Sequence, residues 1–294
     1  MRDNIHALEL GGTLFVPASH KNLETVLSGT KYPDLRSIVI DFEDGLASAN
    51  RQQALDKLPT LLENLNETKL LKFIRPQNKE MLKELLQWEN MDKIDGFILP
   101  KFGLDNAESY LSLFPISNLP FSWHIMPSIE GKELFDIQQL QKLREILLPH
   151  QKQIICIRFG AQDMLRQLSL RQEGSIYNML APSRVIANII STFKPYGFEI
   201  SAPVYPNFSD LDGCQKEIAY ELKNGLISKT IIHPNQIQPL NELYKVCKEE
   251  LKMAQKILEK EDGILKRNGS MGECKTQRGW AKHILLQDNL YGMK

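Results

Sequence analysis

Carboxylate side chains end two neighbouring strand-like runs near the middle of the chain. Glu130 ends the run SWHIMPSIE, and Asp163 ends the next run, IICIRFGAQD. Carboxylates at the same ends of adjacent parallel strands would lie close together and repel, unless a cation neutralises them or one binds a proton. A few oxygen ligands, with room left for water and substrate, suit Mg²⁺, which could polarise a carbonyl group and stabilise an enolate. We favour this metal site over an alternative in which each carboxylate caps a helix or pairs with a basic residue.

An acidic cluster ends an earlier run, SIVIDFED. Alternation along a strand is expected to send Asp41 and Glu43 to one side and Asp44 to the other. One of these residues could hold a metal-bound water, one could orient Arg75 or Lys101, and one could begin the next turn. The spacing leaves the assignment of these roles open.

Basic residues end further runs. Arg75 follows LKFI, where a guanidinium could bind a substrate carboxylate through two hydrogen bonds or pair with the acidic cluster. Lys101 ends GFILPK and could form a Schiff base with a ketone if its pKa were depressed. Metal ligands and a Schiff-base lysine are usually alternative ways of stabilising an enolate, so Lys101 is interpreted as a charge partner. His233, in KTIIHP, could act as a general acid or base, although a lone histidine before proline is more often structural.

The elements that position these residues are strand-like runs separated by segments of helical periodicity. In chain order the runs are TLFVPA, SIVIDFED, LKFIRP, GFILPK, SWHIMPSIE, IICIRFGAQD, ISAPVY and KTIIHP. Strand and helix in regular alternation predict an α/β fold, a closed TIM (β/α)8 barrel with the helices outside. The alternative is an open doubly wound sheet, which normally carries a glycine-rich phosphate loop early in the chain. Gly11 and Gly12 precede their strand and open no helix, so the barrel is favoured.

The chain continues beyond the last of these runs. Residues 1–240 are predicted to form the barrel, and residues 241–294 a C-terminal helical extension. The extension has a glycine-rich middle with Gly263, Gly269 and Gly272. It is interpreted as a lid, with an ordinary packed tail as the alternative.

The composition is that of a globular protein without an excess of either charge. Lys plus Arg and Asp plus Glu both number 36 in 294 residues, which gives no reason to expect nucleic acid or an acidic membrane as a partner. No apolar run approaches the roughly 20 residues that span a bilayer, and the first residues lack the pattern of a secretory signal. The four cysteines show no paired spacing and are interpreted as reduced thiols in a cytoplasmic protein.

Together the motifs resemble those of the HpcH/HpaI aldolase and citrate lyase beta-subunit family, a group of metal-dependent carbon–carbon lyases built on a barrel. The resemblance runs from about Leu14 to Ala281. It is carried, in order, by LFVPAS, VIDFEDGL, FIRP, ILPK, MPSIEG, FGAQD, VYPNFSDLDG and SKTIIHPNQIQPLNELY. The order and spacing of these segments indicate the fold and the metal site more specifically than any one of them.

The resemblance implies Mg²⁺, or Mn²⁺, bound by Glu130 and Asp163, with Arg75 at the carboxylate and carbonyl region of a substrate. Further substrate contacts are expected at Pro100, Gly160 and Ala161. The resemblance also implies a homo-oligomer, a trimer or hexamer, in which the C-terminal segment of one subunit covers a neighbour's site. GSMGECK places Glu273 near an aspartate that the citrate lyase branch carries after a GxM step, so Glu273 is the candidate acid or base.

The predicted function is a carbon–carbon bond lyase of the aldol or Claisen type, acting on a carboxylic acid or acyl-CoA through a Mg²⁺-stabilised enolate. The predicted catalytic set is Arg75, Asp41, Glu43, Asp44, Lys101 and Glu273. The chain departs from the family pattern at Gln162, where FGAQD replaces GAED, and at Gly12 and Thr13, where citrate lyase-like chains carry an arginine. These departures support two alternatives, a 2-oxo-acid aldolase that uses no CoA and a barrel that binds metal or ligand without catalysis. A metal-free aldolase that uses Lys101 is a further alternative.

Overall fold

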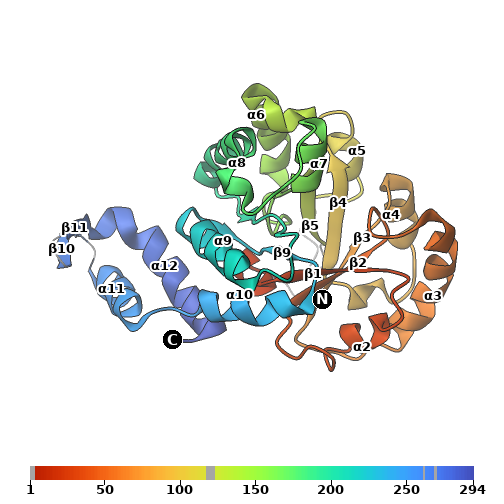
Figure 1. Ribbon diagram of the computed structural model, residues 1–294, viewed down its shortest axis with the longest axis horizontal. Helices are drawn as coiled ribbons and strands as arrows, with labels where there is room; N and C mark the ends of the chain where they lie inside the picture. The colour runs from red at the N-terminus through yellow and green to blue at the C-terminus, as the bar shows by residue number, and fades with distance from the viewer. Residues whose placement is uncertain (1–3, 117–122, 261, 268–269) are drawn as a thin grey trace. The chain divides into compact units, whose positions relative to one another are not determined.

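The computed structural model describes residues 4–116, 123–260, 262–267 and 270–294. The chain divides into two compact units, Met1–Ile237 and Gln238–Lys294. Strands and helices alternate along the first unit, whereas the second consists mainly of helices (Figure 1).

The first unit contains a parallel sheet whose strands follow one another around a curled surface. Seven strands pair side by side in the order β6-β5-β4-β3-β2-β1-β9. They are β1 (Thr13–Pro17), β2 (Ser37–Asp41), β3 (Leu71–Arg75), β4 (Gly96–Phe102), β5 (His124–Ile129), β6 (Arg158–Phe159) and β9 (Thr230–Ile231). Ile38, Val39 and Ile40 are fully buried although successive side chains point to opposite faces, as in a parallel strand that is covered on both sides.

Backbone hydrogen bonds close this sheet into a barrel through β7 (Ile200–Ser201), which also pairs with β8 (Leu226–Ile227). Ile157, just before β6, forms a parallel bridge with the first residue of β7, and its carbonyl accepts the N–H of the second at 2.9 Å. On the other side, the Thr230 N–H donates to the Ala202 carbonyl at 3.1 Å, which connects β7 to β9. The predicted TIM barrel is therefore confirmed.

The sixth run forms a shorter strand than its apolar length predicts. IICIRFGAQD is expected to be a strand that ends at Asp163, but β6 contains only Arg158–Phe159. Gly160 is the N-cap of α7 (Ala161–Gln167), so the GAQD segment begins a helix. The prediction that Asp163 ends a strand is wrong, because this residue lies in the first helical turn, where the helix dipole favours a carboxylate.

Helices cover the outside of the barrel (Figure 1). They are α1 (Ala7–Leu10), α2 (Leu23–Leu27), α3 (Arg51–Glu63), α4 (Lys79–Leu85), α5 (Ala107–Leu111), α6 (Ile137–Leu147), α7, α8 (Leu180–Phe193) and α9 (Leu211–Lys223). Short 3₁₀ turns are η1 (Ser48–Asn50), η2 (Met91–Lys93), η3 (Lys132–Phe135), η4 (Leu148–His150), η5 (Ile176–Asn178), η6 (Lys194–Tyr196) and η7 (Pro234–Gln236). In α6, Leu140, Leu143 and Leu147 recur at helical spacing and are fully buried, while the Asp136 side chain accepts the N–H of Gln138 as a cap.

The second unit has a small apolar core of its own. Its elements are α10 (Ile237–Tyr244), which begins at the boundary, α11 (Lys248–Glu259), an antiparallel hairpin of β10 (Ile264–Arg267) and β11 (Ser270–Glu273), and α12 (Cys274–Tyr291). Ala254, Ile257 and Ala281 are buried in its core, where α11 and α12 pack together. The last helix begins at Cys274, and Gly269, in the glycine-rich middle of the predicted extension, lies outside the described residues.

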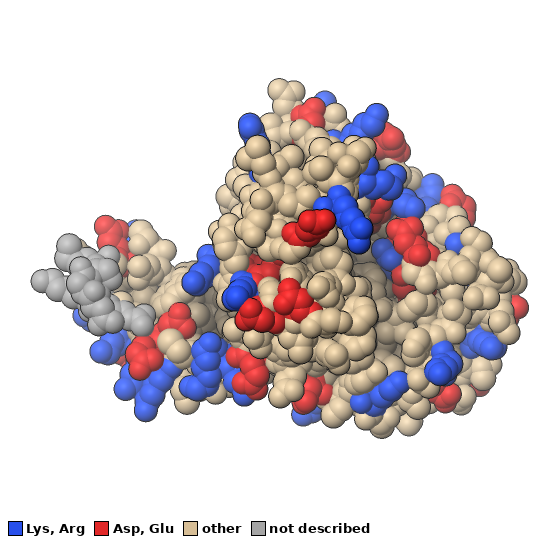
Figure 2. All heavy atoms as spheres, in the orientation of Figure 1, with Lys and Arg blue, Asp and Glu red and all other residues tan. Residues whose placement is uncertain are grey.

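Surface charge is mixed in sign. Acidic and basic side chains are interspersed over the face drawn in Figure 2. This matches the equal numbers, 36 each, of acidic and basic residues in the sequence. Among the helices of the described residues, none combines the length and the apolar character that crossing a membrane requires.

Candidate active site

Arg75 and Asp41 form a bidentate ion pair at the carboxyl ends of two adjacent strands. They are the last residues of β3 and β2 and face each other in the strand register. Arg75 Nε and Nη2 donate to the two carboxylate oxygens of Asp41, each at 2.7 Å. The same carboxylate accepts the backbone N–H of Glu43 at 3.0 Å and of Gly45 at 3.1 Å. Asp41 is thereby fully occupied in holding Arg75 and the following turn, which leaves it no free oxygen for a metal-bound water.

Glu43 joins this pair to Lys101. Its carboxylate lies 2.8 Å from Arg75 Nη1 and 3.0 Å from Lys101 Nζ, in ion pairs whose angles fall outside hydrogen-bond geometry. Asp44 lies 3.7 Å from the same ammonium group. The expectation that Asp44 points away from Glu43 is wrong, because β2 ends at Asp41 and strand alternation does not extend into the turn.

Lys101 is held by the acidic cluster in a charged state. It lies at an irregular point of β4, where the register with β5 shifts, and its φ of 48° is a left-handed conformation. Contact with Glu43 raises the pKa of Lys101, against the lowering effect of burial. A Schiff-base lysine needs the opposite shift, so the structure favours the interpretation of Lys101 as a charge partner.

Glu130 and Asp163 converge on Gly160. Glu130 directly follows β5, and Asp163 extends from α7. A Cβ atom at Gly160 would lie 2.6 Å from Glu130 Cγ and 2.9 Å from Asp163 Oδ2. The two acidic side chains therefore approach each other across a position where only glycine leaves room for both. Asp163 Oδ1 pairs with Arg166 Nη2 at 2.5 Å, which leaves Oδ2 on the Glu130 side.

Glu130 carries a buried oxygen that no described residue satisfies. The residue is 6% exposed, its Oε1 accepts a hydrogen bond from Ser128 Oγ at 2.6 Å, and its Oε2 has no hydrogen-bond partner. Burial raises the pKa of Glu130 to about 7, although the Ser128 hydrogen bond lowers it, and the charges of Glu43 and Asp163 raise it further. A buried carboxylate oxygen without a partner is costly, and a cation beside it would remove that cost.

This donor set fits a hard divalent cation. Across the described ranges, no three His, Cys, Asp or Glu side chains converge in a way that could hold a metal. Glu130 and Asp163 would thus supply two carboxylate ligands and leave the remaining positions to water and substrate. That sharing of the coordination sphere is typical of Mg²⁺ in proteins.

A cavity of about 410 Å³ opens at these strand ends. Most of the site residues predicted from the sequence line this cavity: Arg75, Asp41, Asp44, Glu130, Asp163, Gly160 and Ala161. Glu43 and Lys101 line a neighbouring hollow with Asn78. Pro100 is buried in β4 and belongs to neither lining, and Glu273 lies in the second unit at the start of α12.

His233 has a structural position. It precedes η7, and its Nδ1 accepts the backbone N–H of Asn235 at 3.2 Å. Its ring stacks on Phe208 with the centroids 4.5 Å apart. These contacts fix the turn after β9 and agree with the structural alternative for this residue.

Arg158 is a cavity residue that sequence reasoning missed. It lies in β6, is 3% exposed and lines the cavity. A single cation inside the apolar run IICIRFG was the available signal, because a charged residue in the middle of a buried strand needs a reason to be there.

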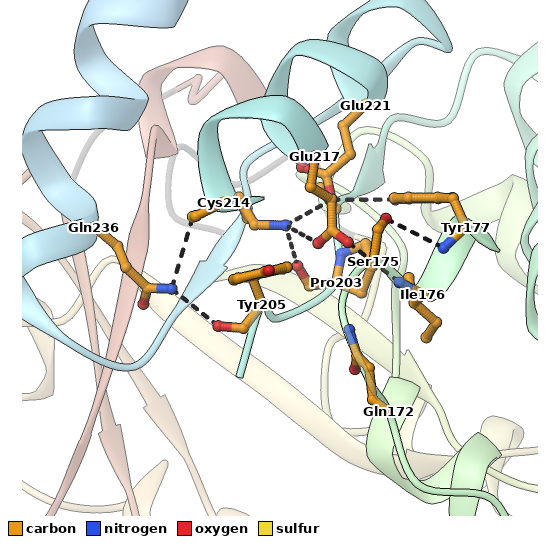
Figure 3. A network of polar contacts seen from close by, with 12 residues as sticks. Gln172, Ser175, Ile176, Tyr177, Pro203, Tyr205, Cys214, Glu217, Glu221 and Gln236 are labelled. Atoms are coloured by element: carbon orange, nitrogen blue, oxygen red, sulfur yellow. Dashed lines mark hydrogen bonds and ion pairs between the residues drawn. The ribbon is translucent and has the colours of Figure 1, made fainter. Parts of the chain in front are cut away.

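A second buried charged group lies in the β9–α9 region and was also missed (Figure 3). Lys229 Nζ donates to Glu217 at 2.9 Å, to Glu221 at 2.6 Å and to the Pro203 carbonyl at 2.8 Å. The Tyr177 hydroxyl donates to Glu221 at 3.1 Å. All three N–H groups of the lysine are used, so this network holds α9 against the barrel wall. The signal was the spacing of Glu217 and Glu221 by one helical turn.

Comparison with known proteins identifies the class. A model of the family described as carbon–carbon bond lyases of the TIM-barrel fold matches residues 4–293. The chain therefore belongs to this family of carbon–carbon bond lyases. Citrate lyase subunit beta of Haemophilus influenzae is 24% identical over 280 residues, which cover 88% of this chain and 90% of that protein. A (3S)-malyl-CoA thioesterase of Cereibacter sphaeroides is 22% identical over 250 residues, covering 82% of this chain and 79% of that protein.

Solved structures share the fold. CitE from Mycobacterium tuberculosis, in complex with magnesium, acetoacetate and coenzyme A, has a TM-score of 0.68 at 18% identity and covers 95% of this chain and 98% of that chain. RipC from Yersinia pestis has a TM-score of 0.61 at 18% identity and covers 83% of this chain and 99% of that chain. The resemblance to citrate lyase beta subunits drawn from the sequence is confirmed at the level of family and fold.

Proposed function

We propose that this protein is a Mg²⁺-dependent lyase that breaks or forms a carbon–carbon bond through an enolate of a small carboxylic acid or acyl-CoA. The observation that carries the proposal is the unpartnered buried Oε2 of Glu130, on a side chain that lies with Asp163 around Gly160. Two carboxylates would be kept together at such a cost only if a cation joins them in the working protein. Mn²⁺ is the alternative metal.

Arg75 would bind the substrate carboxylate. Its guanidinium has five N–H donors. Asp41 accepts one from Nε and one from Nη2, and Glu43 forms an ion pair with Nη1. At least two N–H groups therefore remain for the cavity, in a plane fixed by Asp41 and Glu43. Because these donors are already fixed, they lose little conformational freedom when the substrate binds. They are therefore placed to stabilise negative charge as it develops on the substrate during the reaction.

The bound cation would supply Lewis-acid polarisation of the substrate carbonyl and stabilise the negative charge of the enolate. Glu130 and Asp163 would hold it through their free oxygens, and Ser128 would keep the Glu130 carboxylate oriented. The backbone at Gly160 and Ala161 would form the wall against which the substrate lies.

Glu273 is proposed as the acid or base that moves the hydroxyl proton, acting from the C-terminal segment of a neighbouring subunit in a trimer or hexamer. Its side chain is exposed and, among the described residues, makes no capping hydrogen bond to α12. We propose that the oligomer is cytoplasmic and acts on small molecules, with no nucleic acid or membrane partner.

The site and the relatives support a proposal for the substrate class. A citrate lyase beta subunit from Mycobacterium tuberculosis was solved with oxaloacetate and magnesium, and CitE with acetoacetate and coenzyme A. A small 2-oxo or 3-hydroxy acid, free or as its CoA thioester, would match the cavity of about 410 Å³ and the guanidinium of Arg75.

Exchange of substrate α-protons with deuterated water tests the proposal. Pyruvate, oxaloacetate and acetyl-CoA would be followed by proton NMR with Mg²⁺ and with EDTA. The expected result is Mg²⁺-dependent exchange with at least one of them, lost in Glu130→Gln and Asp163→Asn. Asp212→Asn is the matched control, because Asp212 is an exposed carboxylate on α9 that pairs with Lys216.

Two other outcomes would replace the proposal. Exchange that persists in EDTA, with an adduct on Lys101 trapped by borohydride, would establish a metal-free aldolase. Mg²⁺ binding at Glu130 without exchange on any of these acids would indicate a binding protein.

A further inference from the structure

The guanidinium of Arg158 is buried at the floor of the cavity. Its Nη1 donates to Thr230 Oγ1 at 3.0 Å, its Nη2 to Thr13 Oγ1 at 2.8 Å, and its Nε to the sulfur of Met126 at 3.4 Å. Thr13 and Thr230 are the first residues of β1 and β9. Arg158 therefore reaches toward the amino ends of the strands, below the level of the carboxylates.

No carboxylate neutralises this charge among the described residues. The partners of Arg158 are two hydroxyls and a thioether. Arg75, the other cavity guanidinium, has all three nitrogens on carboxylate oxygens. Both lie over the ring of Phe15, with the guanidinium carbon 5.6 Å from its centroid for Arg158 and 5.1 Å for Arg75. Burying a cation without an anion beside it costs folding free energy.

Donor capacity remains on Arg158. A guanidinium has five N–H groups, and three are used by Thr13, Thr230 and Met126. The remaining two sit on the terminal nitrogens of a residue that lines the cavity. This is the donor arrangement that binds a carboxylate with two hydrogen bonds.

We propose that Arg158 binds a second carboxylate of the substrate, so that the enzyme acts on a dianionic acid: a 2-oxo or hydroxy dicarboxylate, or an acyl group with a terminal carboxylate. The proposal rests on the proposed function, since it assigns the substrate's first carboxylate and carbonyl to Arg75 and the Glu130 side of the cavity. Because the Arg158 guanidinium lies against the first residues of β1 and β9, this carboxylate would be at the inner end of the bound substrate. The bulky part of a thioester would have to remain toward the mouth.

Calorimetric binding of matched acids in the presence of Mg²⁺ tests this assignment. Malate is compared with 2-hydroxybutyrate, and 2-oxoglutarate with 2-oxopentanoate, because each pair differs only by a methyl group in place of the distal carboxylate. A third pair, succinyl-CoA and butyryl-CoA, tests the same exchange in a thioester. The proteins are wild type, Arg158→Met, Arg158→Lys and the control Arg184→Met, which changes an exposed arginine on α8.

The wild type and Arg184→Met are expected to prefer the dianionic member of at least one pair by about tenfold or more, as for a charge-assisted bidentate contact. In Arg158→Met the dianion should weaken by about 10- to 100-fold and the preference disappear, while the monoanion and Mg²⁺ change less than about threefold. Arg158→Lys should keep part of the preference, because lysine keeps the positive charge but cannot donate two parallel hydrogen bonds as a guanidinium does. The pair that shows the effect tells a free dicarboxylate from a thioester.

Two results would overturn the assignment: no preference in any pair for the wild type, or a preference that survives in both Arg158 variants. Removal of an unpaired buried charge should leave the thermal unfolding midpoint of metal-free Arg158→Met at or above that of the wild type. A lower midpoint, with the preference unchanged in Arg158→Lys, would show a structural role only. Proton exchange without a preference for any dianion would support the lyase proposal and reject the role of Arg158. A dianion preference that depends on Arg158, without proton exchange, would support the role of Arg158 and reject the lyase proposal.

Discussion

Replacing Glu130 by glutamine is expected to stabilise the metal-free protein at high pH while removing its metal site. The pKa of Glu130 is raised by burial from 4.5 to about 7, so the folded state holds this proton more tightly than the unfolded state does. Between these two pH values the folded state binds more protons, and the free energy of unfolding falls as the pH rises. The separation of the two pKa values corresponds to about 3 kcal/mol of stability lost by pH 8. The Glu130→Gln protein, whose side chain is an uncharged amide, would not lose this stability.

Urea unfolding in EDTA at about pH 5 and pH 8 measures this effect. Glu130→Gln should exceed the wild type by about 3 kcal/mol at pH 8 and by much less at pH 5. Comparing the two proteins at the same pH removes the contribution of other titrating groups to the free energy of unfolding. One such group is Glu221, whose pKa is also raised to about 7 by burial. Asp212→Asn should stay within about 0.5 kcal/mol of the wild type at both values, because its pair is exposed.

The reasoning would be refuted by a Glu130→Gln protein that is no more stable than the wild type at pH 8. A stabilisation of equal size at both pH values would also contradict it, since that result would come from packing and not from charge. In either case the cost of keeping this carboxylate buried would be too small to indicate a cation partner.

Three further perturbations test other parts of the site. Gly160→Ala should weaken Mg²⁺ binding at least about tenfold by calorimetry, because the new Cβ would lie 2.6 Å from Glu130 Cγ, while φ of −81° accepts alanine without backbone strain. Arg75→Lys should slow proton exchange by about 100-fold or more in NMR assays, since the ammonium group of lysine cannot donate two parallel hydrogen bonds as a guanidinium does. Lys229→Met should lower the free energy of unfolding by about 3–5 kcal/mol in urea, because it strands the buried carboxylates of Glu217 and Glu221. Unchanged values in these assays would contradict each assignment.

The barrel could be predicted because buried parallel strands are apolar on both faces and their polar residues gather where the strands end. This holds for β2 and β3, where Asp41 and Arg75 are the last residues and meet in register. Both interpretations of Arg75 from the sequence are compatible with the structure, since Asp41 and Glu43 hold the guanidinium and still leave N–H donors for a ligand. The runs gave the order of the strands along the barrel for the same reason.

The rest depended on local geometry that spacing does not encode. FGAQD contains no cap residue with a side-chain acceptor before the helix, so the change from strand to helix at Gly160 gave no signal. The irregularity of β4 at Lys101 brings Glu43 and Asp44 to one ammonium group, against simple alternation. Arg158 needed the barrel to be closed, because its partners belong to strands far away in the sequence.

The most direct test of the central claim is the position of a bound divalent cation. Crystals grown with Mn²⁺ and measured at its absorption edge would show an anomalous peak at the metal. The peak is predicted between the carboxylates of Glu130 and Asp163, about 2.2 Å from an oxygen of each, as for a hard cation with oxygen ligands. A peak elsewhere, or none at a saturating concentration of Mn²⁺, would contradict it.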